Sequence, residues 1–293
     1  MMMQWCFPVS TGCPPIVLSH YQVEPILRAR QRGDRAVSVS VDLGLTTSQA
    51  LLEHNGVLFA NGETLDWTAL AEIARSPTKC FAVEARSIRE IKVCSEHTNW
   101  LRTLMPTAGA PTTLVSGTLM HRVKDTEPYR DTLSKVKAIA PLTGRVLDTA
   151  TGLGYTAIEA AKTADEVVTI ELDPAAIEIA RQNPWSHPLF DNPQITIVIG
   201  DADAEVRSFP DRHFSRIIHD PPVIGLAGEL YSLAFYRELF RILARGGRLF
   251  HYIGDLESRS GGRVTPGVIR RLQEAGFTRV VRRPEAFGVT AHR

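Results

Sequence analysis

The sequence predicts an α/β protein: a doubly wound parallel sheet in the C-terminal part and a smaller, mainly β region before it. Three observations predict this fold. From about residue 145, short apolar runs alternate with helical patterns. The first run ends in a glycine-rich turn, and several runs end in a carboxylate, where open α/β sheets bind ligands. We place the boundary after residue 123, which gives regions 1–123 and 124–293.

Composition limits the class of protein. The chain has 293 residues, 44% of them hydrophobic, and a net charge of +1. This length suits about two domains, and the balanced charge gives no overall field that would attract nucleic acid or an acidic membrane. We find neither an apolar run of about 18 residues nor a signal-peptide pattern, so we expect no membrane partner.

The four cysteines are Cys6, Cys13, Cys80 and Cys94. They form no Cys-x-x-Cys pair and are too few for a disulfide scaffold. We therefore expect reduced thiols, a cytoplasmic location and no metal site.

The N-terminal region has strand and hairpin patterns. Residues 37–41 alternate strictly, and Asn55-Gly56 separates two apolar runs, as in a hairpin turn. A short helix is expected at 66–73. Further strands are expected at the end of this list: 80–84, 88–93, 99–104 and 113–119. No residue in this region is catalytic by type, so we expect it to select substrate or to join two copies in a homodimer.

The central motif is the stretch 145–156. Val146 and Leu147 form a strand that ends in Asp148, and Gly152 and Gly154 precede a helical pattern. Glycines let the backbone turn sharply and let a ligand press against it, while the N–H groups of the next helix point into the same space. No third glycine follows, so the dinucleotide fingerprint G-x-G-x-x-G is not met.

The second strand, 167–171, ends in Glu171, and Asp173-Pro174 then caps a helix. Glu171 lies seventeen residues after Gly154, close to the spacing at which an acid binds ribose hydroxyls. A carboxylate can accept two hydrogen bonds from a cis-diol, so the pattern favours a nucleoside ligand.

Two more strands end in polar residues. The strand 195–199 precedes Asp201, which could accept a hydrogen bond from an adenine amino group or cap the next segment. The strand 214–218 precedes His219-Asp220-Pro221-Pro222. Two prolines fix φ and remove two backbone donors, which leaves acceptors suited to an amine. His219 is either a proton shuttle or a hydrogen-bonded strand residue.

These four strand ends together resemble a class I S-adenosylmethionine-dependent methyltransferase, over about residues 125–255. The stretches Asp-Thr-Ala-Thr-Gly-Leu-Gly-Tyr-Thr-Ala and His-Asp-Pro-Pro-Val also resemble a group of uncharacterised, mainly archaeal-type predicted methyltransferases. The stretch from Gly225 to Tyr236 is similar to the spermidine synthase family. Two departures are visible: Ala150 replaces a glycine of the commonest form, and Val223 stands where the amino-methyltransferases have an aromatic residue.

The resemblance implies a Rossmann-like sheet and assigns roles. Asp148, Gly152 and Gly154 would hold the methionine part, Glu171 the ribose and Asp201 the adenine edge. Their neighbours Thr149, Leu172 and Ala202 are expected to bind the cofactor too. The predicted catalytic residues are Asp220, Pro221 and Pro222. Before the first strand, Tyr129 and Asp131 are candidates for lining the pocket or for a solvated connector.

The function expected from this resemblance is transfer of a methyl group from S-adenosylmethionine to an amino nitrogen of a nucleobase or another amine. RNA or a small molecule could carry that amine. The alternative is a polyamine aminopropyltransferase that uses decarboxylated S-adenosylmethionine. That family has an acid between the last glycines of the loop, where this chain has Leu153. An ammonium group buried beside leucine would be costly, which favours methyl transfer.

Overall fold

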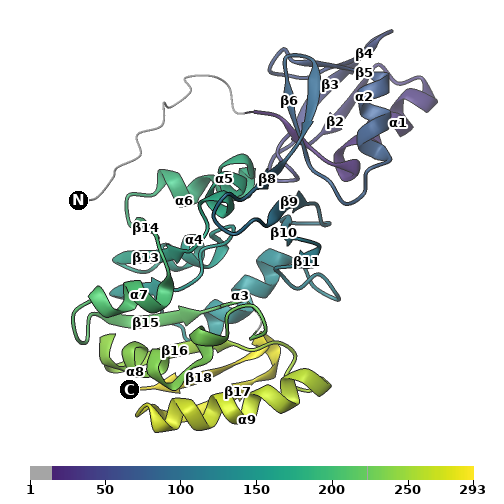
Figure 1. Cartoon of the computed structure of the whole chain (residues 1–293). Coiled ribbons are helices and arrows are strands. Elements are labelled where there is room, and N and C mark those ends of the chain that lie inside the picture. Colours follow the sequence, from purple (N-terminus) through teal and green to yellow (C-terminus); the bar gives the residue numbers. More distant parts are fainter. Residues whose placement is uncertain (1–14, 223) are drawn as a thin grey trace. The chain divides into compact units, whose positions relative to one another are not determined.

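The computed structural model describes residues 15–222 and 224–293, so Cys6, Cys13 and Val223 lie outside the described residues. The chain forms two compact units that divide between Glu90 and Ile91 (Figure 1). Of the cysteines in the described part, Cys80 is buried and Cys94 is exposed, both as free thiols. Among the described helices, none is long and apolar enough to cross a membrane.

The boundary at Glu90 differs from the one expected after residue 123. Residues 91–123 belong to the second unit because the strands β8 (Lys92–Cys94) and β9 (Leu101–Met105) pack on the helix α5 (Pro174–Gln182). The ion pair between Arg102 and Asp173 joins the same elements, 2.9 Å from Nε to Oδ2. A contact across 71 residues leaves no local signal in the sequence.

The first unit contains two antiparallel sheets and two helices. The helix α1 (His20–Arg32) was not predicted. It begins with a Ser19–Gln22 capping box and ends at Gly33 in the left-handed region. The other elements are β1 (Val17–Leu18), β2 (Ala36–Val39), β3 (Ser48–Leu52), β4 (Gly56–Leu58), β5 (Thr64–Asp66), α2 (Trp67–Ala74), β6 (Phe81–Glu84) and β7 (Ser87–Glu90). The Asn55-Gly56 turn joins β3 to β4, as predicted.

The second unit is built on a seven-stranded sheet with the order β14-β13-β12-β15-β16-β18-β17. The first five strands in this order are parallel, and β18 is antiparallel to both its neighbours. The strands are β12 (Arg145–Asp148), β13 (Glu166–Glu171), β14 (Ile195–Ile199), β15 (Phe214–His219), β16 (Leu243–Tyr252), β17 (Thr278–Arg283) and β18 (Gly288–His292). The chain winds outward from β12 on both sides, which confirms the predicted doubly wound sheet with an antiparallel end.

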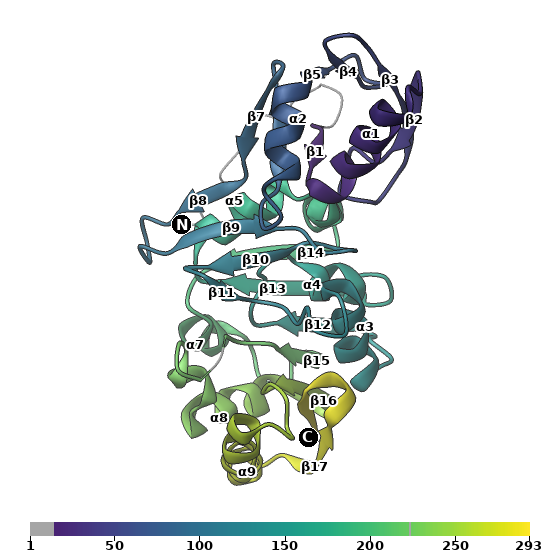
Figure 2. The ribbon, with the colours of Figure 1, turned by 90° about the vertical axis from the view of Figure 1, so that its right-hand side faces the viewer.

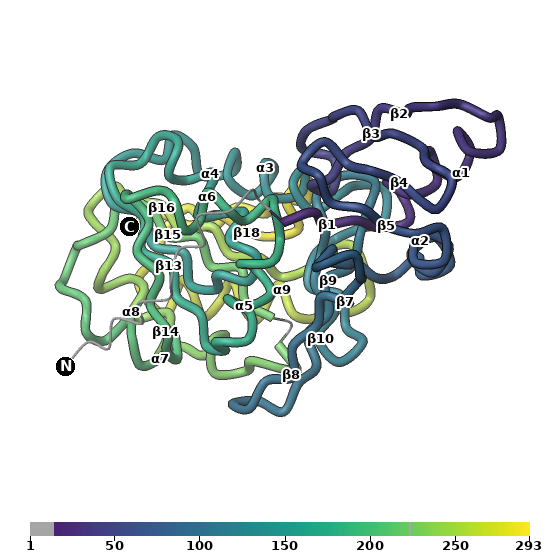
Figure 3. The backbone as a smooth tube through the Cα atoms, turned by 90° about the horizontal axis from the view of Figure 1, so that it is seen from above, coloured from purple at the N-terminus to yellow at the C-terminus, as the bar shows by residue number. Residues whose placement is uncertain are grey.

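Helices cover both faces of this sheet. Figures 2 and 3 show α3 and α4 on one face and α7 and α8 on the other, with α9 beside α8. These and the short helices are α3 (Pro128–Ala138), α4 (Tyr155–Ala160), α6 (His187–Asp191), α7 (Ala202–Glu205), α8 (Leu233–Ile242), α9 (Arg259–Glu274), η1 (Pro184–Ser186), η2 (Val206–Ser208), η3 (Gly228–Tyr231) and η4 (Pro284–Ala286). Phe235 and Leu239 of α8 are fully buried, as the helical spacing indicated.

A second, four-stranded antiparallel sheet precedes α3, in the order β11-β10-β9-β8. It adds β10 (Thr112–Val115) and β11 (Thr118–Leu119) to the two strands that pack on α5. This small sheet belongs to the same unit as the large one.

The structure differs from the sequence prediction at two helix starts and at the last strand. The helix expected at 132–139 begins at Pro128, because Glu127 caps it. The helix expected from Pro266 begins at Arg259, capped by Ser258, and contains Pro266. One final strand was expected, but two are present, and β18 lies between β16 and β17.

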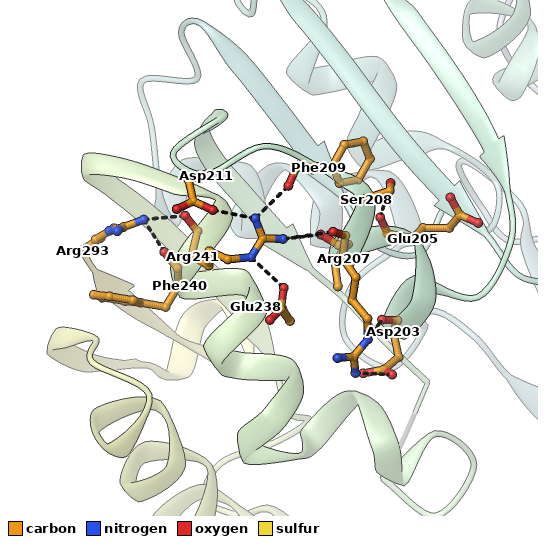
Figure 4. Close-up of polar contacts among 11 residues, drawn as sticks. Asp203, Glu205, Arg207, Ser208, Phe209, Asp211, Glu238, Phe240, Arg241 and Arg293 are labelled. Atoms are coloured by element: carbon orange, nitrogen blue, oxygen red, sulfur yellow. Dashed lines mark hydrogen bonds and ion pairs between the residues drawn. The ribbon is translucent and has the colours of Figure 1, made fainter.

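Arg241 of α8 joins the helical layer to the chain that precedes β15 (Figure 4). Its guanidinium binds the carboxylates of Asp211 and Glu238 at 2.8 Å each, and donates to the carbonyls of Val206 and Phe209. A planar group with five N–H donors is suited to such a junction. This contact fixes the lower layer that supports the sheet.

Candidate functional site

A cavity of about 280 Å³ opens at the carboxyl ends of β12, β13 and β15. The strand order reverses between β12 and β15, which is where open α/β sheets bind ligands. The predicted site residues that line it are Thr149, Gly152, Glu171, Leu172, Asp201, Ala202, Asp220, Pro221 and Pro222. The structure therefore brings nine of the predicted residues together at one cavity, whereas Asp148 and Gly154 do not line it.

The two loop glycines have different surroundings. Gly152 has φ +53°, and a Cβ built there would meet nothing within 4 Å. Gly154 has φ +77°, but a Cβ there would lie 2.6 Å from Cδ2 of Leu189. Gly152 thus leaves space beside the cavity for a ligand, and Gly154 allows the start of α4 to pack closely.

Asp148 lies beneath the loop and is fully buried. Its Oδ2 accepts hydrogen bonds from the hydroxyls of Thr156 and Thr169, at 2.9 and 3.0 Å. Oδ1 has no hydrogen-bond partner among the described residues. Burial, which disfavours the charged form, raises the pKa of Asp148 to about 7.

Glu171 lies at the cavity wall and is held by the backbone. Its Oε2 accepts from the Gly152 N–H at 2.9 Å, and its Oε1 accepts from the Asp173 N–H at 3.0 Å. Burial raises its pKa, although these two hydrogen bonds act in the opposite direction. Each oxygen keeps a second lone pair, so the carboxylate can also accept hydroxyl donors from a ligand.

Asp201 lies at the rim of the cavity and has two roles available to it. It caps α7, because its Oδ1 accepts from the Asp203 N–H at 2.9 Å. Its side chain is exposed, so a second oxygen is free to meet a ligand. Leu172, 46% exposed, adds an apolar surface beside it.

Asp220 on the opposite side of the cavity is paired with a cation that the sequence reasoning missed. Its Oδ2 lies 2.6 Å from Nζ of Lys135, a side chain of α3 that is 3% exposed. Burial raises the pKa of Asp220, and the Lys135 ammonium opposes that shift. The carbonyl of Pro222 accepts from the Tyr231 hydroxyl at 3.0 Å, so it is not free as the sequence suggested.

The pair belongs to a chain of four charges, which we call the acceptor-side network: Arg122, Asp131, Lys135 and Asp220. Asp131 binds Nη1 of Arg122 at 2.8 Å and Nζ of Lys135 at 3.0 Å. Burial lowers the pKa of Lys135, but Asp220 and Asp131 outweigh it, so the net shift is upward. Two cations and two carboxylates give this network no net charge.

His219 is not a proton shuttle. Its ring is fully buried, its Nδ1 lies 2.6 Å from the Thr149 hydroxyl, and its Nε2 lies 3.0 Å from the Leu230 carbonyl oxygen. Burial lowers its pKa to about 3, so the ring is neutral. It joins the cofactor-side loop to η3, and both bonded residues line the cavity.

Several cavity residues come from segments that the sequence analysis did not assign to the site. Tyr129 and Asp131, the candidates from the connector, do not line it. The lining instead includes residues of the small sheet and the segment after it: Trp100, Arg102, Thr113, Val115, Leu119, His121 and Arg122. Their sequence signals are ordinary strand patterns, and only the packing of the small sheet within this unit brings them to the cavity.

These residues fit S-adenosylmethionine. Gly152 leaves the space that a pressed ligand needs, and Glu171 presents lone pairs suited to a ribose diol. The loop N–H groups at the start of α4 favour a carboxylate. The fit assigns Gly152, Glu171 and Asp201 to this ligand, and Asp148 to support of the loop from below.

A family model described as methyltransferase domain matches residues 146–247. An uncharacterised protein of Methanocaldococcus jannaschii is 48% identical over 190 residues, which are 64% of this chain and 65% of that protein. Putrescine N-methyltransferase 4 of Nicotiana tabacum is 27% identical over 138 residues, 45% of this chain and 36% of that enzyme. A polyamine aminopropyltransferase of Mycobacterium tuberculosis is 36% identical over 97 residues, 31% of this chain and 18% of that enzyme.

Among solved structures, a spermidine synthase in complex with the transition state analogue AdoDATO superposes with a TM-score of 0.56 and 21% identity. The match covers 68% of this chain and 72% of that one. The chain spans just under two thirds of the archaeal relative and far less of the two named enzymes. These findings confirm the predicted resemblance: the chain is a class I S-adenosylmethionine-dependent methyltransferase-like protein, and its fold is that of an enzyme with a ligand related to S-adenosylmethionine.

Proposed function

We propose that this protein transfers a methyl group from S-adenosylmethionine to an amino nitrogen held at the Asp220-Pro221-Pro222 turn. One observation carries the proposal: the residues suited to a nucleoside donor and the acceptor turn line the same cavity. When bound, S-adenosylmethionine supplies a methyl group that is already strongly electrophilic. The protein therefore needs to position the acceptor rather than activate it with a strong base.

Each side of the cavity has its own task in this proposal. Gly152 and Glu171 bind and orient the donor, and Asp148 supports their loop from below. The Asp220 carboxylate accepts an N–H hydrogen bond from the acceptor, which directs the nitrogen lone pair into the cavity. Lys135 fixes Asp220 in place, with its ammonium 4.5 Å from the centre of the Tyr252 ring.

The charge of the acceptor-side network favours an uncharged amine. Lys135 compensates Asp220, and Arg122 compensates Asp131, so no excess negative charge remains for a protonated amine. Moving a proton from Lys135 to Asp220 would leave the total unchanged. An ammonium buried there would lack a counter-ion, whereas a neutral amine needs only an acceptor. An exocyclic amine of a nucleobase meets this requirement.

The second candidate is aminopropyl transfer from decarboxylated S-adenosylmethionine. The identity with a polyamine aminopropyltransferase over 97 residues favours it. Leu153, 1% exposed in the donor loop, opposes it. The aminopropyl ammonium would lie near this leucine without a compensating acid, which would cost free energy.

The proposal is tested with S-adenosylmethionine labelled in its methyl group and with total RNA, adenosine and putrescine as acceptor probes. We expect label in an adenine- or cytosine-bearing probe and none in putrescine. Asp220→Ala should abolish transfer but leave donor affinity within about twofold, because the residue acts on the acceptor. Methylation of putrescine, or loss of donor binding in Asp220→Ala, would overturn the assignment.

A further inference from the structure

A row of basic side chains crosses one face of the large sheet, at the end opposite the cavity. Arg216 of β15 lies opposite Arg248 of β16, and Arg248 lies opposite His292 of β18. Paired residues of neighbouring strands point to the same face. Arg279 and Arg283 of β17 extend the group, since both lie close enough to lower the pKa of His292, after burial and together with Arg248 and Arg216. We call these five residues the basic row.

The basic row has no carboxylate partner. None of its nitrogens lies within 4.0 Å of an Asp or Glu oxygen among the residues that the structure describes. Arg216 donates to the carbonyls of Ile139 and Ser215, and Arg248 donates to that of Ala140. Since a guanidinium has five N–H donors, both keep donors for another ligand.

This arrangement is costly in the isolated protein. Like charges directly opposite each other on neighbouring strands destabilise a sheet. Burial and the nearby Arg248 both lower the pKa of Arg216. A polyanion that crosses the row would remove this repulsion.

The charge of the chain is strongly divided, although its total is near zero. Residues 241–293 contain eleven arginines and four acidic residues, a net charge of +7, so the other residues carry −6 within the total of +1. Four of the five members of the basic row fall in this positive segment. The balanced total therefore hides a local field of the kind that attracts phosphates.

The face that carries the basic row is open. Val281, which lies opposite Thr290 on this face, is 44% exposed, and Arg279 is exposed beside it. The helix α9 packs on β17, and its buried residues join the core with Val289 and Ala291, which point to the other face (Figure 1). Four strands spaced by about 4.8 Å give the row a length of about 14 Å, which spans several phosphates rather than one.

We propose that the basic row is a binding surface for the phosphate backbone of a nucleic acid. The inference does not depend on the reaction at the cavity, since it rests on a different set of residues. If the acceptor is a nucleobase amine, the row would hold the same molecule by its backbone, and phosphate contacts position a nucleic acid without reading its sequence.

The test measures fluorescence anisotropy of a labelled 20-nucleotide single-stranded RNA between 50 and 200 mM salt. The variant is the double substitution Arg279→Gln and Arg283→Gln, which leaves the two arginines that bind backbone carbonyls intact. Losing two phosphate contacts should reduce the salt slope by about 1.4 and weaken binding roughly tenfold to thirtyfold at 0.1 M salt.

The matched control is Arg259→Gln with Arg263→Gln, two exposed arginines of α9. It removes the same charge and should change affinity by less than twofold. Equal losses in both variants, or unchanged binding in the Arg279 and Arg283 variant, would overturn the proposal. Poly-glutamate is the competitor: competition at equal charge would instead indicate an acidic protein partner. Because the readout is binding, it can fail while methyl transfer persists.

Discussion

The two sides of the cavity hold their carboxylates in different ways. On the donor side, Glu171 is held by the backbone N–H groups of Gly152 and Asp173 and meets no side-chain cation there. On the acceptor side, Asp220 is held by the ammonium of Lys135, 85 residues away. The donor side therefore keeps a charged acceptor for hydroxyl groups, whereas the acceptor side is electrically balanced. A protein can thus place two acids in one cavity and give them different ligand preferences.

Lys135→Met should produce the largest effect, because it leaves Asp220 buried without its cation. Breaking a buried ion pair from one side costs about 3–5 kcal/mol. Urea unfolding would measure the loss, with the exposed Lys137→Met as control, expected within about 0.5 kcal/mol. Adding Asp131→Asn to Lys135→Met should recover part of the stability, since one uncompensated carboxylate is removed. Equal stability of the Lys135 and Lys137 variants would contradict the balanced network.

Asp148 should make stability fall as pH rises. Its pKa in the folded protein is about 7, above its ordinary value of 3.8, so the folded state binds more protons between these values. The cost is absent below pH 3.8, grows through this window and is complete above pH 7, at about 4 kcal/mol.

Asp148→Asn should remove this pH dependence, because its side chain stays neutral. Unfolding free energies at pH 4.5 and 7.5 would show it, with the exposed Asp165→Asn as control. The fall in stability should be smaller in Asp148→Asn than in the wild type and unchanged in the control. Equal slopes in all three proteins would show that Asp148 is ionised at ordinary cost.

The two loop glycines should separate folding from donor binding. Gly154→Ala should destabilise the fold by about 1–3 kcal/mol, because its methyl would meet Leu189. Gly152→Ala should cost about 1 kcal/mol in stability from its positive φ. It should also weaken S-adenosylmethionine binding at least tenfold, because the methyl enters the space beside the cavity. Thermal melts and calorimetry would separate the two effects, and the opposite pattern would exchange the two roles.

The sequence predicted the donor side better than the acceptor side, for a physical reason. Asp148, Gly152 and Glu171 lie at ends of consecutive strands, so hydrophobic periodicity and turn residues locate them. Lys135 looks like one more basic residue on a helix, and its partner depends on how α3 packs. The small sheet was assigned to the other region for the same reason, since its contact with Asp173 is formed only in the folded unit.

The smallest effect should come from the rim of the donor side. Asp201→Asn keeps an oxygen that can cap α7, so stability should change by less than about 0.5 kcal/mol. Donor affinity should fall only a few-fold, because the side chain is exposed and hydrated. Calorimetry with S-adenosylmethionine would measure it. A loss as large as that of Gly152→Ala would show that the rim, rather than the loop, dominates donor binding.

The most direct test of the account is calorimetric titration of the wild-type protein with S-adenosylmethionine and, separately, with its decarboxylated form. The account predicts tight binding of S-adenosylmethionine and binding at least tenfold weaker of the decarboxylated form, because its ammonium would lie beside Leu153 without a carboxylate. Preference for the decarboxylated form would contradict methyl transfer and favour aminopropyl transfer.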